Sequence, residues 1–215
     1  LYLTGIGDDS IDWTDGWQGN IQYAVVHQFS DAGDRGIEAD NLEGNNDATP
    51  RSKPTIANLT IIGSDAADDG ILLRRGTGIN LHNVIVQGAG AACLDLDSKA
   101  TFTNGWSDGS WTGDLTIDNA IINGCSKPFA DVSKDKNEMP FTVKKWFNKS
   151  GDNNQQAKPG IKSMKRANPD YRIKSGSAAD ASGSKPGSWF DQTDFIGAAG
   201  TDTDWTDGWT IQAKN

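Results

Sequence analysis

Methionine, histidine and cysteine are scarce in this sequence, which has two of each among 215 residues. His27 and His82 lie far apart, and neither a His-Glu-x-x-His nor a Cys-x-x-Cys motif occurs, so the common zinc-binding spacings are absent. No apolar run reaches the roughly 18 residues expected of a membrane-spanning helix, so no membrane span is predicted.

Positive charge is also limited. Lysine and arginine total 20 against 29 acidic residues, which gives a formal net charge of −9. Proteins bind nucleic acids by neutralising phosphates with lysine and arginine, so no nucleic-acid partner is expected. Anionic membranes are disfavoured for the same reason, and the plainest consequence of the acidic balance is solubility.

Hydrophobic residues make up only 35% of the chain, whereas glycine occurs 25 times. Such a composition is typical of a turn-rich β protein rather than a helical bundle. The apolar residues are nevertheless clustered, so global disorder is not expected. A solenoid reconciles the two observations, because each coil buries a narrow apolar strip and exposes the rest.

A short strand pattern recurs after acidic or small turn residues. In each copy Ser, Gly or Cys precedes an aliphatic residue, and a second apolar residue follows two places later. This alternation is typical of a half-buried strand. The copies span residues 8–13, 34–40, 68–73 and 91–97.

A second strand pattern has an amide or small polar residue in its first half and a glycine at its end. It spans residues 56–63, 81–88 and 117–124, with a looser copy at 21–28. Stacking of these copies would align one amide per coil, and aligned amides can hydrogen-bond up and down the stack. Glycine at the strand end suits a sharp backbone turn. The aligned residues are Asn58, Asn83 and Asn119 for the amides, and Gly63, Gly88 and Gly124 for the turns.

The two patterns alternate strictly along the chain. Equivalent aliphatic residues of the first pattern are separated by 26 residues (11 to 37), 34 (37 to 71) and 23 (71 to 94). The shortest step approximates one bare coil, and longer steps carry loops. An antiparallel sandwich also has many short strands, but gives no reason for this alternation. The sequence therefore predicts an all-β, right-handed parallel β-helix, or solenoid.

Three segments follow from this pattern. Residues 1–125 form the β-helix coils, with insertions at 41–53 and 98–113. Residues 126–187 are rich in Lys, Ser, Asn, Gly and Pro, and are expected to cover the helix irregularly, apart from a short amphipathic stretch at 143–148. Residues 188–215 form a tryptophan-rich C-terminal cap.

A tryptophan motif occurs near both ends of the chain. Residues 204–210 repeat the residue types of 12–18, with an Asp-Gly pair between two tryptophans. Asp-Gly suits a tight turn, and the flanking indoles can bury a large area beside it. Both copies are therefore predicted to pack as turn-plus-aromatic plugs.

Cys93 and Cys125 each lie at the edge of a repeat motif. A disulfide between them is geometrically plausible. Two buried free thiols are the main alternative, and a reactive thiol is a third.

The outward side chains of the first pattern form the most suggestive surface. If Ile11, Ile37, Ile71 and Leu94 point inward, the outward row contains Asp12, Glu38, Leu72 and Asp95. Neighbouring rungs lie roughly 4.8 Å apart, so Asp12 and Glu38 favour either a bound cation or a raised pKa. The row is therefore interpreted as a Ca²⁺ face formed by Asp12, Glu38 and Asp95, or as a solvated acidic surface.

Polysaccharide lyases with a β-helix fold combine such carboxylates with a basic residue that takes a proton. Arg74 or Arg75 could serve as that base, although Leu72 interrupts the row and the acidic chain would repel a polyanion. Trp106 and Trp111 lie in a loop suited to stacking on sugar rings, and burial as loop anchors is the alternative.

Several stretches resemble secreted bacterial proteins with pectate-lyase-like β-helix repeats, often labelled lipoproteins or hypothetical proteins. The resemblance rests on residues 7–17, 31–41, 70–76 and 190–210, and covers most of the chain apart from 126–187. Members of this family carry further coils on the N-terminal side. The resemblance implies a parallel β-helix and export from the cell, and it implies no particular activity.

The chain starts at Leu1 inside a β-like run and carries no signal peptide, which we interpret as a processed product or a fragment. A first coil of this kind would expose unpaired backbone groups. We expect either missing N-terminal coils or another subunit to pair there, and stacking that does not close gives filaments.

These observations favour a non-enzymatic structural or adhesive protein at the outer cell surface or outside the cell. The alternative is a carbohydrate-binding or polysaccharide-lyase-like β-helix that acts on a polysaccharide with Ca²⁺.

Overall fold

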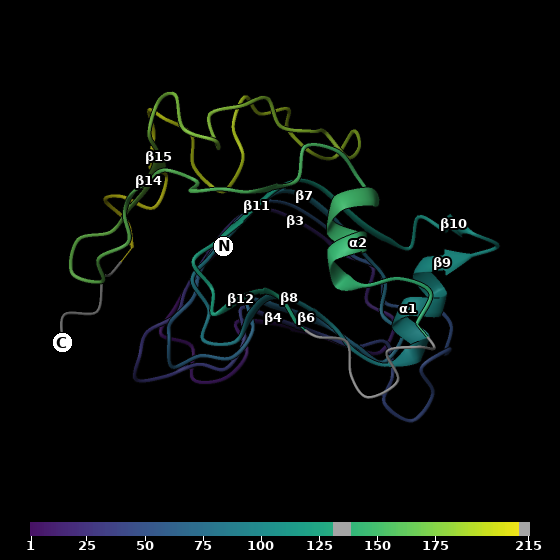
Figure 1. Cartoon of the computed structure of the whole chain (residues 1–215). Coiled ribbons are helices and arrows are strands. Elements are labelled where there is room, and N and C mark those ends of the chain that lie inside the picture. The colour runs from purple at the N-terminus through teal and green to yellow at the C-terminus, as the bar shows by residue number, and fades with distance from the viewer. Residues whose placement is uncertain (131–138, 211–215) are drawn as a thin grey trace.

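The computed structural model describes residues 1–130 and 139–210. It is an all-β parallel β-helix, as the sequence predicts, and Figure 1 views it with the two sheets above and below the core. Sheet A contains β1 (Tyr2–Thr4), β3 (Asn20–His27), β5 (Thr55–Ile62), β7 (Ile79–Gln87), β11 (Leu115–Asn123) and β13 (Gln155–Gln156). Sheet B contains β2 (Ile11–Trp13), β4 (Ile37–Ala39), β6 (Ile71–Leu73), β8 (Ala92–Leu96) and β12 (Lys127–Phe129).

The register of sheet B aligns the aliphatic residues of the first repeat. Ile11 lies opposite Ile37, Ile37 opposite Ile71, and Ile71 opposite Leu94, always between parallel strands. Ile37 and Ile71 have no exposed surface. The predicted aliphatic column therefore forms the core, and an antiparallel sandwich is excluded.

Sheet A bends at one residue in each of its four long strands. Tyr23, Asn58, Asn83 and Asn119 all have left-handed backbone conformations, with φ between 50° and 61°. Asparagine tolerates this conformation better than most residues, which explains why it recurs there. The predicted amide column therefore exists as a column of bends.

The amides of this column do not bond chiefly to one another, contrary to the sequence prediction. Asn58 Nδ2 donates to the carbonyl of Gly197 at 3.1 Å, and Asn83 Nδ2 donates to the carbonyl of Ser184 at 2.8 Å. The left-handed bend turns these side chains outward, toward the C-terminal segment that covers sheet A. They attach that segment to the coils.

Glycine is required where the sheet A strands end. A Cβ atom on Gly63 would lie 1.7 Å from the carbonyl oxygen of Gly88 on the next coil, and Gly88 itself has φ +71°. The predicted turn column is thus a place where successive backbones approach closely.

The insertion after β8 is more regular than the sequence suggested. It forms helix α1 (Lys99–Gly105) and a hairpin of β9 (Trp106–Ser107) and β10 (Ser110–Trp111). Beyond Cys125, where the repeat in the sequence ends, β12 and β13 still extend sheets B and A. Their pairing is short, and their side chains lack the aliphatic alternation that would have revealed them.

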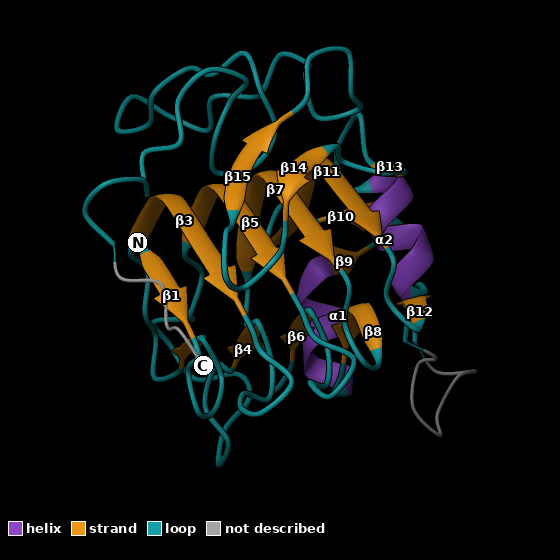
Figure 2. Cartoon of the chain, turned by 90° about the vertical axis from the view of Figure 1, so that its left-hand side faces the viewer, coloured by secondary structure: helices purple, strands orange, loops and turns teal. Residues whose placement is uncertain are grey.

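The two ends of the solenoid differ. Helix α2 (Val143–Lys149), which coincides with the predicted amphipathic stretch, lies over the end at β11, with Trp146 and Phe147 buried against the core. The hydroxyl of Thr142 caps it by accepting from the Lys145 N–H at 3.1 Å. At the other end, Figure 2 shows β1 at the edge of the stack. Among described residues, β1 pairs only with β3, and β2 pairs only with β4.

Sheet A is covered on its outer side as well. The hairpin of β14 (Ile161–Ser163) and β15 (Asp170–Ile173), with the chain that follows, lies over this face (Figures 1 and 2). Outward residues such as Ile62 and Ile85 pack there against Tyr171 and Ile196 in a second hydrophobic cluster.

The two tryptophan motifs differ in environment. Trp13 is only 5% exposed, and its Nε1 donates to Thr77 Oγ1 at 3.0 Å, so the first copy is a buried plug. Trp209 in the second copy is 64% exposed and stacks on Trp205. The second copy forms a plug only in part, because Trp205 packs against the second hydrophobic cluster whereas Trp209 lies on the outside of the cover. No described helix has the length and apolarity needed to cross a membrane.

Candidate functional site

The outer face of sheet B carries the row predicted from the sequence. Asp12 lies opposite Glu38, Glu38 opposite Leu72, and Leu72 opposite Asp95. Leu72 occupies a full rung, so Glu38 and Asp95 are two rungs apart, or about 9–10 Å. The structure therefore brings Asp12 and Glu38 together but leaves Asp95 outside any ligand shell that they could form.

Arginines neutralise this row. Arg35 Nη1 lies 2.9 Å from Glu38 Oε2, and Arg74 also donates to Glu38 while its Nε lies 2.8 Å from Asp40 Oδ1. Arg75 Nη1 lies 2.6 Å from Asp40 Oδ2. Glu38 and Asp40 thus already have cationic partners, so a cation bound at Glu38 would compete with Arg35 and Arg74.

The same contacts bear on Arg74 as a base. Partial burial acts to lower the pKa of Arg74, but the hydrogen bond and charge of Asp40, together with Glu38, raise it above its ordinary value. A general base must present an unprotonated nitrogen near working pH. Arg74 therefore suits a positioning or binding role better than proton abstraction.

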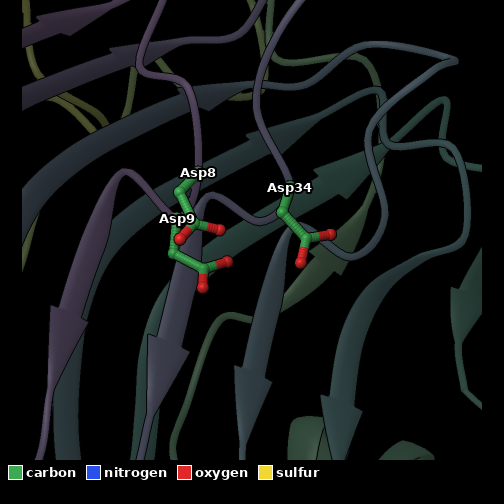
Figure 3. Close-up of side chains that lie close together, drawn as sticks. All are labelled: Asp8, Asp9 and Asp34. Carbon is green, nitrogen blue, oxygen red and sulfur yellow. The ribbon is translucent and has the colours of Figure 1, made fainter.

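A second acidic group was missed at the sequence level. Asp8, Asp9 and Asp34 offer carboxylate oxygens within 4.8 Å of one another (Figure 3). Burial, followed by the charge of Glu38, raises the pKa of Asp9 to about 6. Arg35 again lies beside the group, with Nη1 2.5 Å from Asp34 Oδ2. The acidic turn before each first-pattern strand was the available signal, because stacked turns bring these residues together.

A groove runs beside the row on sheet B. Its volume is about 580 Å³, and we call it the sheet B groove. Leu72 and Asp95 contribute to its wall, and burial, followed by the charges of Asp69 and Asp97, raises the pKa of Asp95 to about 7. Asp95 can therefore both donate and accept hydrogen bonds near neutral pH. The groove is lined chiefly by Arg35, Asp68, Leu72, Arg74, Asp95 and Lys127.

Trp106 and Trp111 are partly buried loop anchors. Their rings meet edge to face, with centroids 4.8 Å apart, and Phe141 packs against Trp111 at the same distance. Lys145 Nζ lies 3.9 Å above the Trp106 ring. This cation occupies the indole face that a sugar would need.

His82, Ser184 and Asp118 lie close together although they are distant in sequence. His82 Nδ1 lies 2.9 Å from Ser184 Oγ, and the same nitrogen lies 3.6 Å from Asp118 Oδ2. A catalytic relay needs the serine and the carboxylate on different ring nitrogens. The trio therefore fastens the C-terminal segment rather than forming a nucleophilic triad.

Cys93 and Cys125 form a disulfide, with Cα atoms 5.5 Å apart. The bond links β8 to the turn after β11. The disulfide was one of three alternatives left open by the sequence, beside two buried free thiols and a reactive thiol.

Comparison with known proteins gives one match. A family model described as a pectate-lyase like beta helix domain matches residues 1–210. No curated protein and no solved structure gives a significant match. The matched span includes both sheets, the sheet B groove and the covering segment. The chain therefore belongs to the pectate-lyase-like β-helix family.

Proposed function

We propose that this protein is an extracellular or cell-surface β-helix that binds a polysaccharide in the sheet B groove. The observation that carries the proposal is the groove itself, in which fixed hydrogen-bonding groups surround the apolar side chain of Leu72. Membership of a pectate-lyase-like family supports a carbohydrate-related role. The ion pairs of Arg35 and Arg74 hold their guanidinium groups in place, which reduces the entropy lost on binding.

The charges around the groove favour a neutral polysaccharide over a polyuronate. The guanidinium groups of Arg35 and Arg74 already face carboxylates, so little of their positive charge is left for an anionic ligand. Asp95 and Asp97 line the same groove. A polyanion would meet these carboxylates and the negative charge of the whole chain.

The disulfide supports the proposed location. Structural disulfides form and persist in oxidising compartments, which include the bacterial periplasm and the cell exterior. The Cys93–Cys125 bond is therefore consistent with export.

Binding without catalysis is favoured over lyase chemistry. The ion pairs of Arg74 keep it protonated, so Arg74 is a poor general base for proton abstraction. Incubation with polygalacturonate and Ca²⁺, followed by absorbance of unsaturated products, tests the lyase alternative. Product that disappears in Arg74→Ala would overturn the non-catalytic proposal.

A groove-filling variant tests the proposed site. Ala91 lines the sheet B groove, so Ala91→Trp should block it without removing a charged group. The control is Ala66→Trp, at an exposed turn position outside the groove. Affinity electrophoresis in gels containing neutral polysaccharides should show retardation of the wild type and Ala66→Trp, and loss of part of it in Ala91→Trp. Equal retardation of all three proteins contradicts the groove as a binding site.

Calcium remains a proposal only for Asp8, Asp9 and Asp34, whose oxygens already lie close together. Any heat of Ca²⁺ binding in calorimetry should disappear in Asp8→Asn and persist in Asp12→Asn. Binding heat that persists in Asp8→Asn and disappears in Asp12→Asn would instead indicate that Ca²⁺ binds at the sheet B row.

Self-association is a second candidate function. It is favoured by the contrast between the α2-covered end and the edges of β1 and β2, each of which has one strand partner among the described residues. Light scattering after size-exclusion chromatography should show a mass that rises with protein concentration. A monomer at every concentration argues against this function.

A further inference from the structure

A second pocket lies on the opposite side of the solenoid, where the C-terminal cover meets the bend of β3. Its volume is about 240 Å³, and its wall includes three aromatic rings, those of Tyr23, Phe195 and Trp205. We call it the aromatic pocket. The cover lies on the outer side of sheet A, away from sheet B (Figure 1), so this pocket is separate from the sheet B groove.

The three rings are held in place by the structure around them. Tyr23 donates its hydroxyl to Asp191 Oδ2 at 3.3 Å, and Trp205 Nε1 donates to the carbonyl of Ala198 at 2.8 Å. Phe195 lies against Gly200, where an added Cβ would come within 2.8 Å of the ring. A ligand that meets these rings therefore finds them already ordered.

Tyr23 is unusual for its place in the fold. It has φ +61° at the bend where the next three coils have asparagine. Bulky residues rarely adopt this conformation, whereas asparagine does so readily. Asparagine would form the same bend with less backbone strain. The presence of tyrosine therefore indicates that its ring has a function beyond forming the bend.

The polar part of the pocket consists of acceptors and hydroxyl groups. Asp194, Asp202 and Thr203 line it and are exposed, beside the three rings. A hexopyranose presents apolar C–H groups on its ring faces and hydroxyl groups around its rim. The rings suit the first feature, and the carboxylates and threonines suit the second.

Size and charge narrow the ligand further. The pocket is smaller than the roughly 300–1,000 Å³ typical of sites for drug-sized ligands, so it suits one ring. Asp194 and Asp202 in the wall, with Asp191 beside it, oppose a uronic acid or a sulfated sugar. We infer that the aromatic pocket binds one neutral hexopyranose unit of a glycan. This inference does not require the sheet B groove to bind.

Calorimetry with three defined probes tests the inference. Cellohexaose and mannohexaose are the neutral probes, and the hexamer of galacturonic acid is the anionic one. The wild type should bind at least one neutral hexamer and should bind the galacturonate hexamer at least tenfold more weakly. The indole N–H resonance of Trp205, assigned by its loss in Trp205→Phe, should shift with the neutral hexamer.

Tyr23→Asn is the decisive variant, because the chain itself uses asparagine at this bend on three other coils. It should keep the far-ultraviolet spectrum and melting temperature of the wild type and bind the neutral hexamer about tenfold more weakly. Trp189→Ala, at an exposed tryptophan outside the pocket, is the matched control and should bind as the wild type does.

Two readouts separate this site from the groove. Ala91→Trp blocks the sheet B groove and should leave the Trp205 shift intact, whereas Tyr23→Asn should remove it. Wild-type affinity in Tyr23→Asn, no Trp205 shift with either neutral hexamer, or equal binding of the galacturonate hexamer would each overturn the inference.

Discussion

Arg74 on the coil of β6 donates a 2.8 Å hydrogen bond from Nε to Asp40, which follows β4 one rung away. It also contacts Glu38, and the carboxylates of both residues are mostly buried. Arg74 therefore joins two coils through groups that cannot easily be solvated separately. Its removal leaves Arg35 as the partner of Glu38 and Arg75 as the partner of Asp40, without the group that joins the two carboxylates.

Arg74→Met should lower the free energy of unfolding by about 2–3 kcal/mol, because Glu38 and Asp40 lose a partner while remaining largely buried. Urea unfolding measures this change. Adding Asp40→Asn to the variant should recover part of the loss. Arg172→Met, which breaks the surface pair with Asp170, is the control and should change stability little. Similar losses in both single variants would contradict the role assigned to Arg74.

Asp95→Asn should stabilise the protein above neutral pH. Burial, followed by Asp69 and Asp97, raises the pKa of Asp95 to about 7 from an ordinary 3.8, so the folded state binds the proton more tightly than the unfolded state. Wild-type stability from this group is therefore present below about pH 4 and is lost as pH rises through 7. The variant should gain about 1 kcal/mol, or about 2–4 °C in melting temperature, at pH 8 after allowing for solvent screening.

Scanning calorimetry at pH 4 and pH 8 checks this prediction. The difference between Asp95→Asn and the wild type should be small at pH 4, where Asp95 is protonated in the folded state and only partly ionised in the unfolded state. Asp108→Asn, at an exposed turn, provides the control. A gain that is equal at both pH values would show that the carboxylate charge is not responsible.

His27 should affect the pH dependence of stability in the opposite direction to Asp95. Burial, followed by the positive charge of Arg166, lowers the pKa of His27 to about 4 from 6.5. The unfolded state then binds more protons between these values, so this contribution is present above pH 6.5 and is lost as pH falls toward 4. His27→Gln, which can keep a hydrogen bond to Tyr171, should show a flatter fall in stability from pH 6.5 to 4.5. Urea unfolding at several pH values measures the slope, and parallel curves for the two proteins would contradict the prediction.

Removal of the disulfide should destabilise the coils around β8 and β11. Cys93 and Cys125 close a loop with a sequence separation of 32 residues, and loss of such a bond typically lowers the free energy of unfolding by about 2–4 kcal/mol. The double alanine variant should melt at a lower temperature than the wild type. In dithiothreitol, the melting temperature of the wild type should fall toward that of the variant. A variant that melts at the same temperature as the oxidised wild type would show that the disulfide does not stabilise the fold.

The periodic part of the fold could be predicted from the sequence. Ile37 and Ile71 belong to copies of one pattern, and a stack places such copies on neighbouring rungs whatever the loops between them contain. The outward row of Asp12, Glu38, Leu72 and Asp95 followed from the same alternation. Periodicity therefore placed the candidate surface.

The contacts across that surface could not be predicted. Whether Arg35 and Arg74 meet Glu38 depends on how each long side chain turns across rungs, which the alternation does not specify. The partners of Asn58 and Asn83 come from a segment more than 100 residues later that has no repeat of its own. Trp17 and Trp209 show the same limit, because they occupy equivalent places in the two tryptophan motifs, yet Trp17 packs against the core and Trp209 is exposed.

The attachment of the cover to the bends restricts how this protein can change in length. Residues near 184 and 197 bond to successive coils through Asn83 and Asn58, and Asp191 reaches Tyr23 on the coil before them. Repeat proteins commonly grow or shrink by duplicating or deleting a unit, because each unit contacts only its neighbours. Here an extra coil between β3 and β7 would move one anchor out of reach of the others. The cover therefore fixes the number of coils in this region. A coil can be added or lost there only if the spacing of the anchoring residues within 184–197 changes with it.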